Sequence, residues 1–407
     1  MKKRDVLFLC QYSYPEVNSS ATLPFDTAVS LAQQGYQVNV ICGWPKEYST
    51  EVSVPAQETV SGVSVRRLRY FQSSRVGKIG RLLNFFSFTA AVLLRLSALR
   101  NYRCVMVYSN PPILPLVCVL ANALFHTKFV FVVYDVYPEV AFASGALRQG
   151  GLISRVMNRI NKMVFRRAAH VVALTEEMKQ FLLTCRPELT PERISVVPNW
   201  AHEGFVSPEA ETRLRLGCSE ETLLVSYFGN LGVCQDVKTM LDAMELLGSD
   251  EQIRLVIAGH GSKLPEVRVR AEALANVQIL PFLTGEDFEK IAAVCDCGIV
   301  SLERGLRGTC APSKYYSYLQ SGQPVLAIAD SDSYLTEEIR RERIGFSVSQ
   351  GDGEALAECL RAMKLDHSGT REMGARAREL YLRRYDQPIA MERYSKMIAS
   401  IIEEEGR

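Results

Sequence analysis

The sequence predicts an α/β protein in which two doubly wound parallel-sheet domains face a cleft. Three observations favour this class. The chain has 407 residues, more than a single hydrophobic core usually organises. Short apolar runs alternate with amphipathic stretches, and runs such as 129–134 are apolar at successive positions, as a strand covered on both faces must be. A polar stretch at 200–221, which contains Pro208 and Gly217, interrupts this alternation.

The first half of the chain alternates between strands and helices. Strands are expected at residues 6–10, 37–41, 63–70, 104–108, 129–134, 170–173 and 194–198. Helices are expected at 23–34, 79–100, 154–168 and 175–183. Because this order joins strands through helical crossovers, it predicts a parallel sheet.

The alternation restarts after the polar stretch. Strands are expected at 223–228, 253–258, 277–280, 297–300 and 325–328, and helices at 237–247, 312–321, 334–341 and 388–404. These elements predict a first domain at 1–200, a linker at 201–221, a second domain at 222–385 and a C-terminal crossover helix at 386–407. Open parallel sheets bind ligands outside the carboxyl ends of their strands, so we expect a ligand in the cleft between the two sheets.

Composition excludes several classes of protein. The apolar fraction of 47% and the charged fraction of 23% exclude wholesale disorder, collagen and coiled coil. The net charge of +2 excludes a strongly basic nucleic-acid binder, although it leaves room for a local basic patch. Most of the 11 cysteines lie in apolar runs, and Asp5 interrupts the first apolar run, which is too short for a secretory leader. We therefore expect a reducing compartment, either the cytoplasm or the cytoplasmic face of a membrane.

One long stretch contains no acidic residue. Between Glu58 and Asp135 there is no Asp or Glu, and the basic residues inside it are Arg66, Arg67, Arg69, Arg75, Lys78, Arg81, Arg95, Arg100, Arg103 and Lys128. Within it, residues 79–99 are rich in Phe and Leu, but Arg81 and Arg95 interrupt them, so a spanning helix is disfavoured. The pattern favours an interfacial helix on an anionic membrane surface. The alternative is a buried packing helix with solvated arginines.

Three loops of the second half have the composition of a phosphate site. The first is Gly229-Asn-Leu-Gly232, and the second is Gly259-His-Gly261 with Lys263 just after it. Glycine has no Cβ, so such loops allow backbone amides to approach a ligand closely. The third, Pro312-Ser-Lys314, opens a helix whose free N–H groups and lysine attract anions. Each loop alone occurs in many α/β proteins, but together they predict a diphosphate site.

These motifs resemble those of a known family. Together with Ser321-Gly-Gln-Pro324, Tyr14-Pro-Glu-Val-Asn18, Asp135-Val-Tyr-Pro-Glu139 and Val197-Pro-Asn-Trp200, they look like the motifs of the family 4 retaining glycosyltransferases. The set is similar to the WbuB-like subgroup, which builds bacterial O-antigen, capsule and colanic-type polysaccharides. The resemblance covers essentially the whole chain. It implies the GT-B fold, with two Rossmann-like domains and a C-terminal helix that returns to the first.

The resemblance also implies an activity and its partners. It implies a metal-independent hexosyltransferase without a cofactor, which moves a sugar, an N-acetylated amino sugar, from a UDP-sugar substrate. The implied acceptor is a saccharide linked to a lipid, undecaprenyl diphosphate. No nucleic acid takes part. Such an enzyme is expected in the cytoplasm, peripheral on the inner face of the cytoplasmic membrane.

Carried over motif by motif, the resemblance implies site residues. The donor-binding residues are Gly229, Asn230, Gly232, Gly259, His260, Gly261, Lys263, Phe282, Glu303, Arg307, Pro312, Ser313 and Lys314; the acceptor-binding residues are Asn18, Ser19, Ser20 and Ala21; the catalytic residues are Asp135 and Glu139. The chain departs from the family where many members have Arg and Lys after the first glycine loop and two Glu before the Gly-x-Pro turn. Those positions hold Asn230, Gln235 with Asp236, Thr309 and Ser317. We therefore expect Lys263, Arg304, Arg307 and Lys314 to neutralise the diphosphate and Glu303 to replace the first acid.

Asp135 is the leading catalytic candidate because it follows a strongly apolar strand, with Glu139 one helical turn further on. It is expected to bond a sugar hydroxyl or to stabilise an oxocarbenium-like transition state. A helix cap is the alternative. Asp330-Ser-Asp332 has the form of a metal-binding D-x-D motif, but it follows a strand where a solvated loop is expected, so we predict no metal there.

Two other functions remain possible from the sequence alone. A UDP-sugar 2-epimerase also has two nucleotide-binding sheets, but it needs several acid–base carboxylates and histidines, and few candidates are visible. A non-catalytic sugar-nucleotide-binding subunit is supported by the missing Arg, Lys and Glu.

Overall fold

The computed structural model describes residues 3–45, 54–72, 78–201, 207–248, 252–283 and 285–403. The chain divides into two compact units. Unit 1 comprises Met1–Asn199, Gly308–Ala311 and Pro388–Arg407, and unit 2 comprises Trp200–Arg307 and Pro312–Gln387. The sequence passes from unit 1 to unit 2 after Asn199, contributes the short segment Gly308–Ala311 to unit 1, and returns to unit 1 at Pro388.

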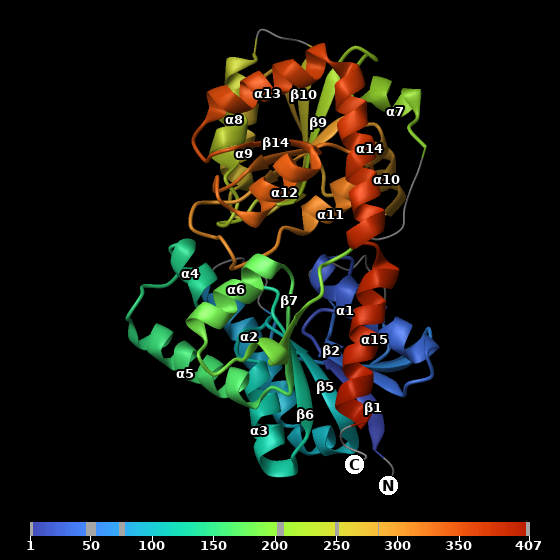
Figure 1. Ribbon diagram of the computed structural model, residues 1–407, viewed down its shortest axis with the longest axis vertical. Coiled ribbons are helices and arrows are strands. Elements are labelled where there is room, and N and C mark those ends of the chain that lie inside the picture. The colour runs from blue at the N-terminus through green and yellow to red at the C-terminus, as the bar shows by residue number, and fades with distance from the viewer. Residues whose placement is uncertain are drawn as a thin grey trace. The chain divides into compact units, whose positions relative to one another are not determined.

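Unit 1 is built on an eight-stranded sheet. Its strands are β1 (Arg4–Leu9), β2 (Val38–Gly43), β3 (Gln57–Val60), β4 (Val63–Leu68), β5 (Tyr102–Tyr108), β6 (Lys128–Val132), β7 (His170–Ala173) and β8 (Ile194–Val196). Their order is β3-β4-β2-β1-β5-β6-β7-β8. Figure 1 labels β1, β2, β5, β6 and β7 of this sheet. All neighbours pair in parallel except β3 and β4. The chain therefore winds outward from β1 in both directions, as the sequence predicted.

The helices of unit 1 cover this sheet. They are α1 (Ser19–Gln33), α2 (Lys78–Leu93), the 3-10 helix η1 (Leu96–Asn101), α3 (Pro115–Phe125), α4 (Glu139–Ala143), α5 (Leu152–Arg167), α6 (Glu176–Cys185), the 3-10 helix η2 (Pro191–Arg193) and α15 (Gln387–Glu403). The expected return of the C-terminal helix to the first domain is confirmed, since α15 belongs to unit 1. Arg103 and Lys128, at the starts of β5 and β6, donate to the carbonyls of Ile402 and Ile401 at 2.7 and 3.1 Å.

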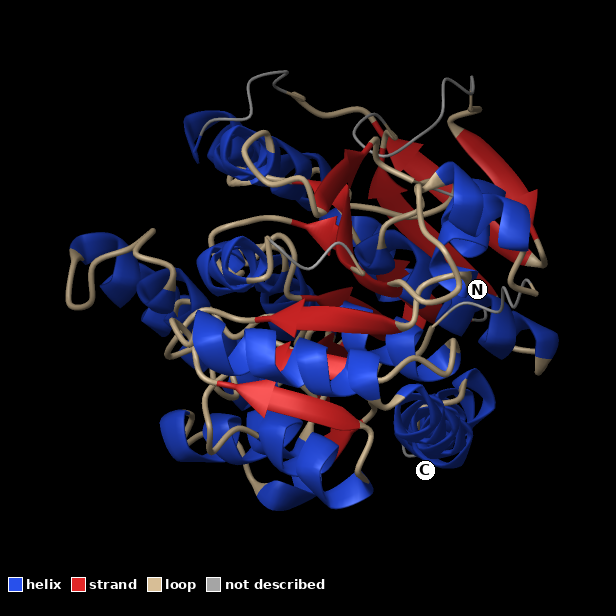
Figure 2. Cartoon of the chain, turned by 90° about the horizontal axis from the view of Figure 1, so that it is seen from above, coloured by secondary structure: helices blue, strands red, loops and turns tan. Residues whose placement is uncertain are grey.

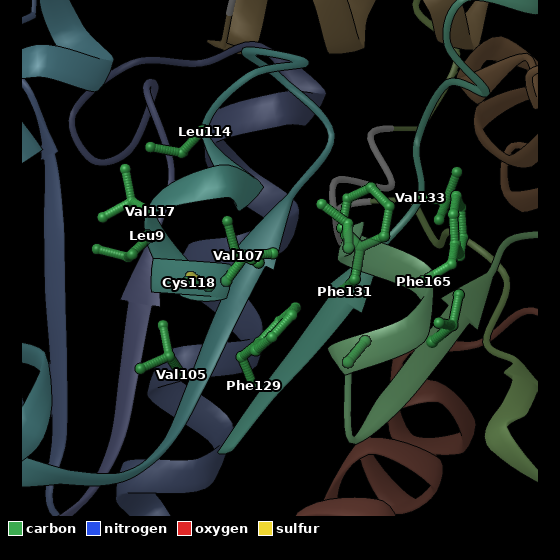
Figure 3. Close-up of a cluster of buried hydrophobic side chains, with 14 of the residues drawn as sticks. Leu9, Val105, Val107, Leu114, Val117, Cys118, Phe129, Phe131, Val133 and Phe165 are labelled. Carbon is green, nitrogen blue, oxygen red and sulfur yellow. The ribbon is translucent and has the colours of Figure 1, made fainter. Parts of the chain in front are cut away.

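The core of unit 1 lies between the sheet and one helical layer. Alternate residues of β5 and β6, such as Val105 and Phe129, pack against Val117 of α3 and Phe165 of α5 (Figure 3). Phe88 of α2 joins the same cluster. α2, η1, α3, α5 and α6 therefore cover one face of the sheet. The alternate strand residues on the other face are buried as well, which is why these strands read as continuous apolar runs.

Unit 2 is a second doubly wound sheet. Its strands are β9 (Leu223–Asn230), β10 (Ile253–His260), β11 (Val277–Leu280), β12 (Cys297–Ser301), β13 (Val325–Ile328) and β14 (Gly345–Val348). They pair in parallel in the order β11-β10-β9-β12-β13-β14. The helices are α7 (Ala210–Arg215), α8 (Val237–Leu246), α9 (Leu264–Ala271), α10 (Gly285–Ala293), α11 (Ser313–Gln320), α12 (Tyr334–Glu342), α13 (Gly353–Leu365) and α14 (His367–Arg384). Successive residues of β9, such as Leu224 and Val225, enter different clusters, so helices cover both faces (Figure 2).

Several elements differ from the sequence expectation. The sequence did not predict β3, because its residues Gln57–Val60 are mostly polar and the strand lies at the edge of the sheet. Ser61 and Gly62, with φ of 49° and 82°, form the turn through which β3 pairs with β4. α1 begins at Ser19 rather than 23 and contains Pro24. The expected helix 79–100 is divided into α2 and η1.

The described part of the expected linker 201–221 is not a free connection. It contains α7, and Leu216 and Cys218 are buried in the core of unit 2. Arg213 fastens it, donating to the Val294 carbonyl at 2.7 Å and pairing with Asp296 at 2.9 Å. The polar composition of this stretch gave no sign of these contacts.

Among the described residues, no helix is both long enough and apolar enough to cross a membrane.

Replacing Phe129 with Ala should destabilise unit 1 by about 3–5 kcal/mol, because it leaves a cavity among side chains that pack from both β5 and α3. Urea unfolding followed by circular dichroism measures this change. Leu124→Ala is the matched control, since Leu124 is 62% exposed. Equal effects of the two substitutions would contradict the assignment of the core.

Candidate functional site

The order of strands in unit 2 locates a candidate ligand site. The chain runs outward from β9 to β10 and β11 on one side, and from β12 to β13 and β14 on the other. The loops that follow β9 and β12 therefore diverge at the carboxyl edge of the sheet. Doubly wound sheets bind ligands at this switch point. The three motifs selected from the sequence all follow β9, β10 or β12.

The glycines of these motifs allow the ends of β9 and β10 to approach each other. A Cβ on Gly259 would lie 2.0 Å from the carbonyl oxygen of Gly229, and one on Gly261 would lie 2.5 Å from that of Leu231. Gly229 and Gly261 have φ of +116° and +139°, where other residues are strained. The glycines are thus required by close backbone packing at the carboxyl ends of β9 and β10.

Lys263 connects the loops that follow β9 and β12 through hydrogen bonds. Its Nζ donates to the Gln235 carbonyl at 2.6 Å and to Glu303 Oε1 at 2.5 Å. The Gln235 side chain accepts from the Gly232 N–H at 2.9 Å, and Asp236 accepts from the Thr239 N–H at the start of α8. Lys263 and Glu303, both expected in the donor site, are therefore paired with each other.

Two of the expected cations also have internal partners. Arg307 pairs with Asp332, and Arg304 donates to the Gln350 carbonyl at 2.7 Å. Asp330 accepts from the Gln350 side chain at 3.2 Å. The two aspartates of the D-x-D sequence thus fasten the loops after β12 and β13. Within the residues that the structure describes, no group of three or more His, Cys, Asp or Glu side chains is arranged to hold a metal ion.

Lys314 is different. It lies in the first turn of α11, which begins at Ser313 just after Pro312, with its Nζ 4.6 Å from the centre of the Tyr227 ring and 3.4 Å from the Asn230 carbonyl oxygen. In the described part of the chain no carboxylate pairs with it. Burial lowers the pKa of its ammonium group from 10.5 to about 8. A desolvated cation without a counter-ion, at the start of a helix, attracts an anion.

An aromatic pair lies beside these loops. His260, at the end of β10, contacts Phe282 edge to face, with ring centroids 5.0 Å apart. The Phe282 side chain is 45% exposed. An exposed aromatic ring next to a glycine loop can offer a stacking surface for a base or sugar ring.

Asp135 occupies the corresponding edge of unit 1. Its backbone N–H donates to Ser109 Oγ at 3.1 Å, and the loop residue Thr309 accepts from the next N–H, that of Val136, at 2.7 Å. α4 begins at Glu139 with Pro138 as its N-cap, so Asp135 caps no helix. The half-buried Asp135 carboxylate has no hydrogen-bond partner among the described residues. Burial raises its pKa from 3.8 to about 6.

The Glu139 carboxylate is already engaged. Both of its oxygens accept from Arg186, at 2.8 and 2.7 Å, and the same guanidinium nitrogen donates to the Tyr137 carbonyl at 3.1 Å. Arg186 was missed in the sequence because it lies 47 residues from Glu139. The pair holds the loop that carries Asp135, which indicates a positioning role for Glu139.

The expected acceptor residues form the first turn of α1. Ala21 is buried, whereas Ser19 is exposed and Ser20 partly exposed. Asn18 is the N-cap position, but its side chain makes no capping bond. Its Nδ2 and the Oε1 of Gln11 are buried, and neither has a hydrogen-bond partner in the described chain. Gln11 was missed, although a polar residue directly after a buried strand is the signal that would have found it.

Comparison with known proteins identifies a domain in each half of the chain. Residues 25–200 match the glycosyl transferase 4-like domain, and residues 222–366 match glycosyl transferases group 1. The chain is 24% identical over 314 residues to the probable glycosyltransferase WbjE of Pseudomonas aeruginosa, covering 76% of this chain and 77% of that one. It is 21% identical over 339 residues to the putative colanic acid biosynthesis glycosyl transferase WcaI of Escherichia coli K12, covering 79% and 82%.

Solved structures share the fold. A sucrose-phosphate synthase of Thermosynechococcus elongatus superposes with a TM-score of 0.78 at 14% identity, covering 98% of this chain and all (100%) of that one. HepE of Anabaena, in complex with UDP-glucose, superposes with a TM-score of 0.70 at 16% identity, with 98% and 100% covered. With one glycosyl transferase domain matched to each sheet, the chain is a glycosyltransferase of the GT-B type.

Proposed function

We propose that the chain transfers a sugar from a UDP-sugar to a lipid-linked saccharide during assembly of a bacterial surface polysaccharide. The proposal rests on Lys314, a half-buried cation without a carboxylate partner at the switch point between β9 and β12. UDP-glucose in the HepE complex and the colanic acid role in the name of WcaI support the donor and the pathway class. The donor sugar is an N-acetylated amino sugar, and the acceptor lipid is undecaprenyl diphosphate.

The diphosphate of the donor is the group that Lys314 would bind. A diphosphate with two negative charges beside its Nζ replaces the water that burial removed, and the N-terminus of α11 adds a favourable dipole. When the sugar leaves, negative charge grows on the diphosphate, so the same contacts strengthen in the transition state. Backbone amides and a lysine then perform the role that a divalent ion has in other transferases. The reaction needs neither metal nor cofactor.

The transfer retains the anomeric configuration. The departing diphosphate oxygen takes the proton of the acceptor hydroxyl, so no separate acid–base pair is required. Asp135 stabilises the positive charge that develops on the transferred sugar. Its raised pKa fits this role, because a desolvated carboxylate gains most from an approaching positive charge.

The acceptor lipid requires contact with a membrane. α2 has a buried side, with Phe88 and Val92 fully enclosed, and an outer side on which Leu82 and Phe86 are 52% and 58% exposed. This outer side is the proposed contact with the inner face of the cytoplasmic membrane. Of the expected basic contacts, Arg75 and the side chains of Lys78 and Arg81 lie outside the described residues.

The direct test is a transfer assay. The purified protein is incubated with UDP-N-acetyl amino sugars, with and without an undecaprenyl-diphosphate-linked saccharide, and UDP release and the anomeric configuration of the product are measured. Release that depends on the acceptor, with retained configuration, supports the proposal. Conversion of the donor alone indicates a 2-epimerase, and binding without turnover indicates a non-catalytic subunit.

Lys314→Met should weaken UDP-sugar binding about tenfold or more at pH 7, because it removes a charge-assisted contact. Wild-type affinity should be constant below the lysine pKa of about 8 and fall above it, since the neutral amine no longer attracts the diphosphate. Titration calorimetry across this pH range checks both effects. Lys238→Met is the control, because that lysine is exposed and paired with Asp242 on α8. A fall above pH 8 that persists in Lys314→Met would refute the assignment.

Asp135→Asn should lower kcat/KM about a hundredfold. In the wild type, kcat/KM should fall as the pH drops through about 6, where Asp135 takes up a proton, and the variant should lack this limb. The raised pKa means that the charged form of Asp135 lowers the free energy of unfolding above pH 6. The Asp135→Asn substitution should therefore not lower the unfolding temperature at pH 8. Glu139→Gln is the contrast: losing the bond to Arg186 lowers the unfolding temperature and leaves the limb near pH 6. An unchanged limb in Asp135→Asn would exclude Asp135 from catalysis.

Excess EDTA should leave turnover intact, and Asp330→Asn with Asp332→Asn should change kcat/KM by less than about threefold. The physical reason is that these carboxylates bind Arg307 and Gln350 rather than a metal that offsets the diphosphate. If chelation abolishes turnover and magnesium or manganese restores it, the metal-free mechanism is wrong.

A further inference from the structure

Four of the five helices in one layer of unit 1 contain no acidic residue; the fifth, α6, has Glu176 and Glu177 in its first turn. α2, η1, α3 and α5, which pack on one face of the sheet, have no Asp or Glu in their sequences (Figure 1). The stretch from 140 to 175, which includes α5, also lacks acids. Its basic residues are Arg148, Arg155, Arg159, Lys162, Arg166 and Arg167. A solvated helical surface normally mixes both signs of charge, so the outer surface of these four helices is unusual.

α5 has two distinct sides. Val164 and Phe165 are buried in the core, and Ser154 and Asn161 are buried on the same side. On the outer side, the first turns carry Leu152, Ile153 and Val156, which are 78%, 63% and 50% exposed. Three branched apolar side chains held in water at one end of a helix form a patch that the fold of unit 1 does not require.

The cations around this patch are largely uncompensated. Arg155, Arg159 and Arg166 are exposed, and none has an ion-pair partner among the described residues. Lys162 alone on the helix has one, Glu188 at 3.6 Å. Arg167 donates to the neutral Asn122 side chain at 3.3 Å. The partner of this surface must therefore supply negative charge.

The distribution of apolar and basic groups favours lipid over a protein partner. Protein interfaces usually have an apolar centre inside a polar rim. Here the exposed aliphatic side chains occupy the first turns of α5 together with Arg155, and Arg159 and Arg166 follow on the outer side. Apolar groups continue on the same layer with Leu124 of α3, 62% exposed, and Leu94 after α2, 88% exposed. This pattern fits the boundary between anionic headgroups and acyl chains.

We propose that α5 is a second membrane-binding element, independent of α2, that docks on an anionic lipid surface. Leu152, Ile153 and Val156 enter the acyl boundary, while Arg155, Arg159 and Arg166 bind headgroup phosphates. The inference rests on the proposed function, because a lipid-linked acceptor requires membrane contact. Two weak contacts on one rigid layer bind more tightly than either alone and fix the orientation of unit 1 on the surface.

The test measures partitioning onto vesicles of phosphatidylglycerol and phosphatidylcholine by sedimentation. The full chain with Leu152→Ser, Ile153→Ser and Val156→Ser should partition about tenfold less than the wild type, because the exposed aliphatic groups no longer enter the lipid. Arg155→Gln, Arg159→Gln and Arg166→Gln should weaken binding and flatten its dependence on salt. The control is Val269→Ser with Leu365→Ser, two residues of unit 2 that are 70% and 83% exposed; it should bind as the wild type does.

Unchanged partitioning of the aliphatic triple variant would overturn the proposal. A second outcome would also overturn it: the wild type dimerises in analytical ultracentrifugation, while the triple variant is monomeric and still binds vesicles. The patch would then be an interface between two copies of the chain. Transfer to a detergent-solubilised acceptor separates this inference from the proposed function. The triple variant should keep that activity, whereas a wild type that binds vesicles but transfers nothing contradicts only the proposed function.

Discussion

The donor side of the molecule depends on the close approach of two backbone segments at the ends of β9 and β10. Because Gly259 has no Cβ, the Gly229 carbonyl occupies the space where one would lie, 2.0 Å away. This contact brings the loop after β9 onto the start of α9, where Leu231 bonds His260 and Lys263. Lys263 in turn reaches Glu303 after β12. Lys314 meets the end of β9 directly, through the Tyr227 ring and the Asn230 carbonyl.

Charge compensation separates structural from functional candidates. Lys263 and Arg307 are neutralised by Glu303 and Asp332, so these four charges stabilise loops. Lys314 and Asp135 have no such partner in the described chain, and burial moves the pKa of each toward neutrality. Desolvating an unpaired charge costs folding free energy. Proteins retain an unpaired, desolvated charge mainly where function requires it, and we therefore assign the proposed chemistry to these two groups.

The sequence predicted those elements whose burial leaves a continuous apolar run. β5 and β6 are covered on both faces, so their strands are visible without any partner information. β3 and β14 are short and only partly buried, and this pattern resembles a loop. The glycine loops and Lys314 were also predictable, because their chemistry is local. Two ion pairs could not be predicted, Lys263 with Glu303 and Glu139 with Arg186. Their partners lie 40 and 47 residues apart in the sequence, and only the folding of the sheet brings them together.

The whole-chain charge of +2 conceals a strong asymmetry. Between residues 59 and 175 the sequence has 16 Lys and Arg but only two acids, Asp135 and Glu139. Glu139 is neutralised by Arg186, and the raised pKa of Asp135 leaves part of its population neutral near pH 6. The acids that balance the total lie elsewhere in the sequence. A near-neutral composition therefore excludes non-specific binding of polyanions by the whole protein, yet it is compatible with four acid-free helices that meet a charged surface.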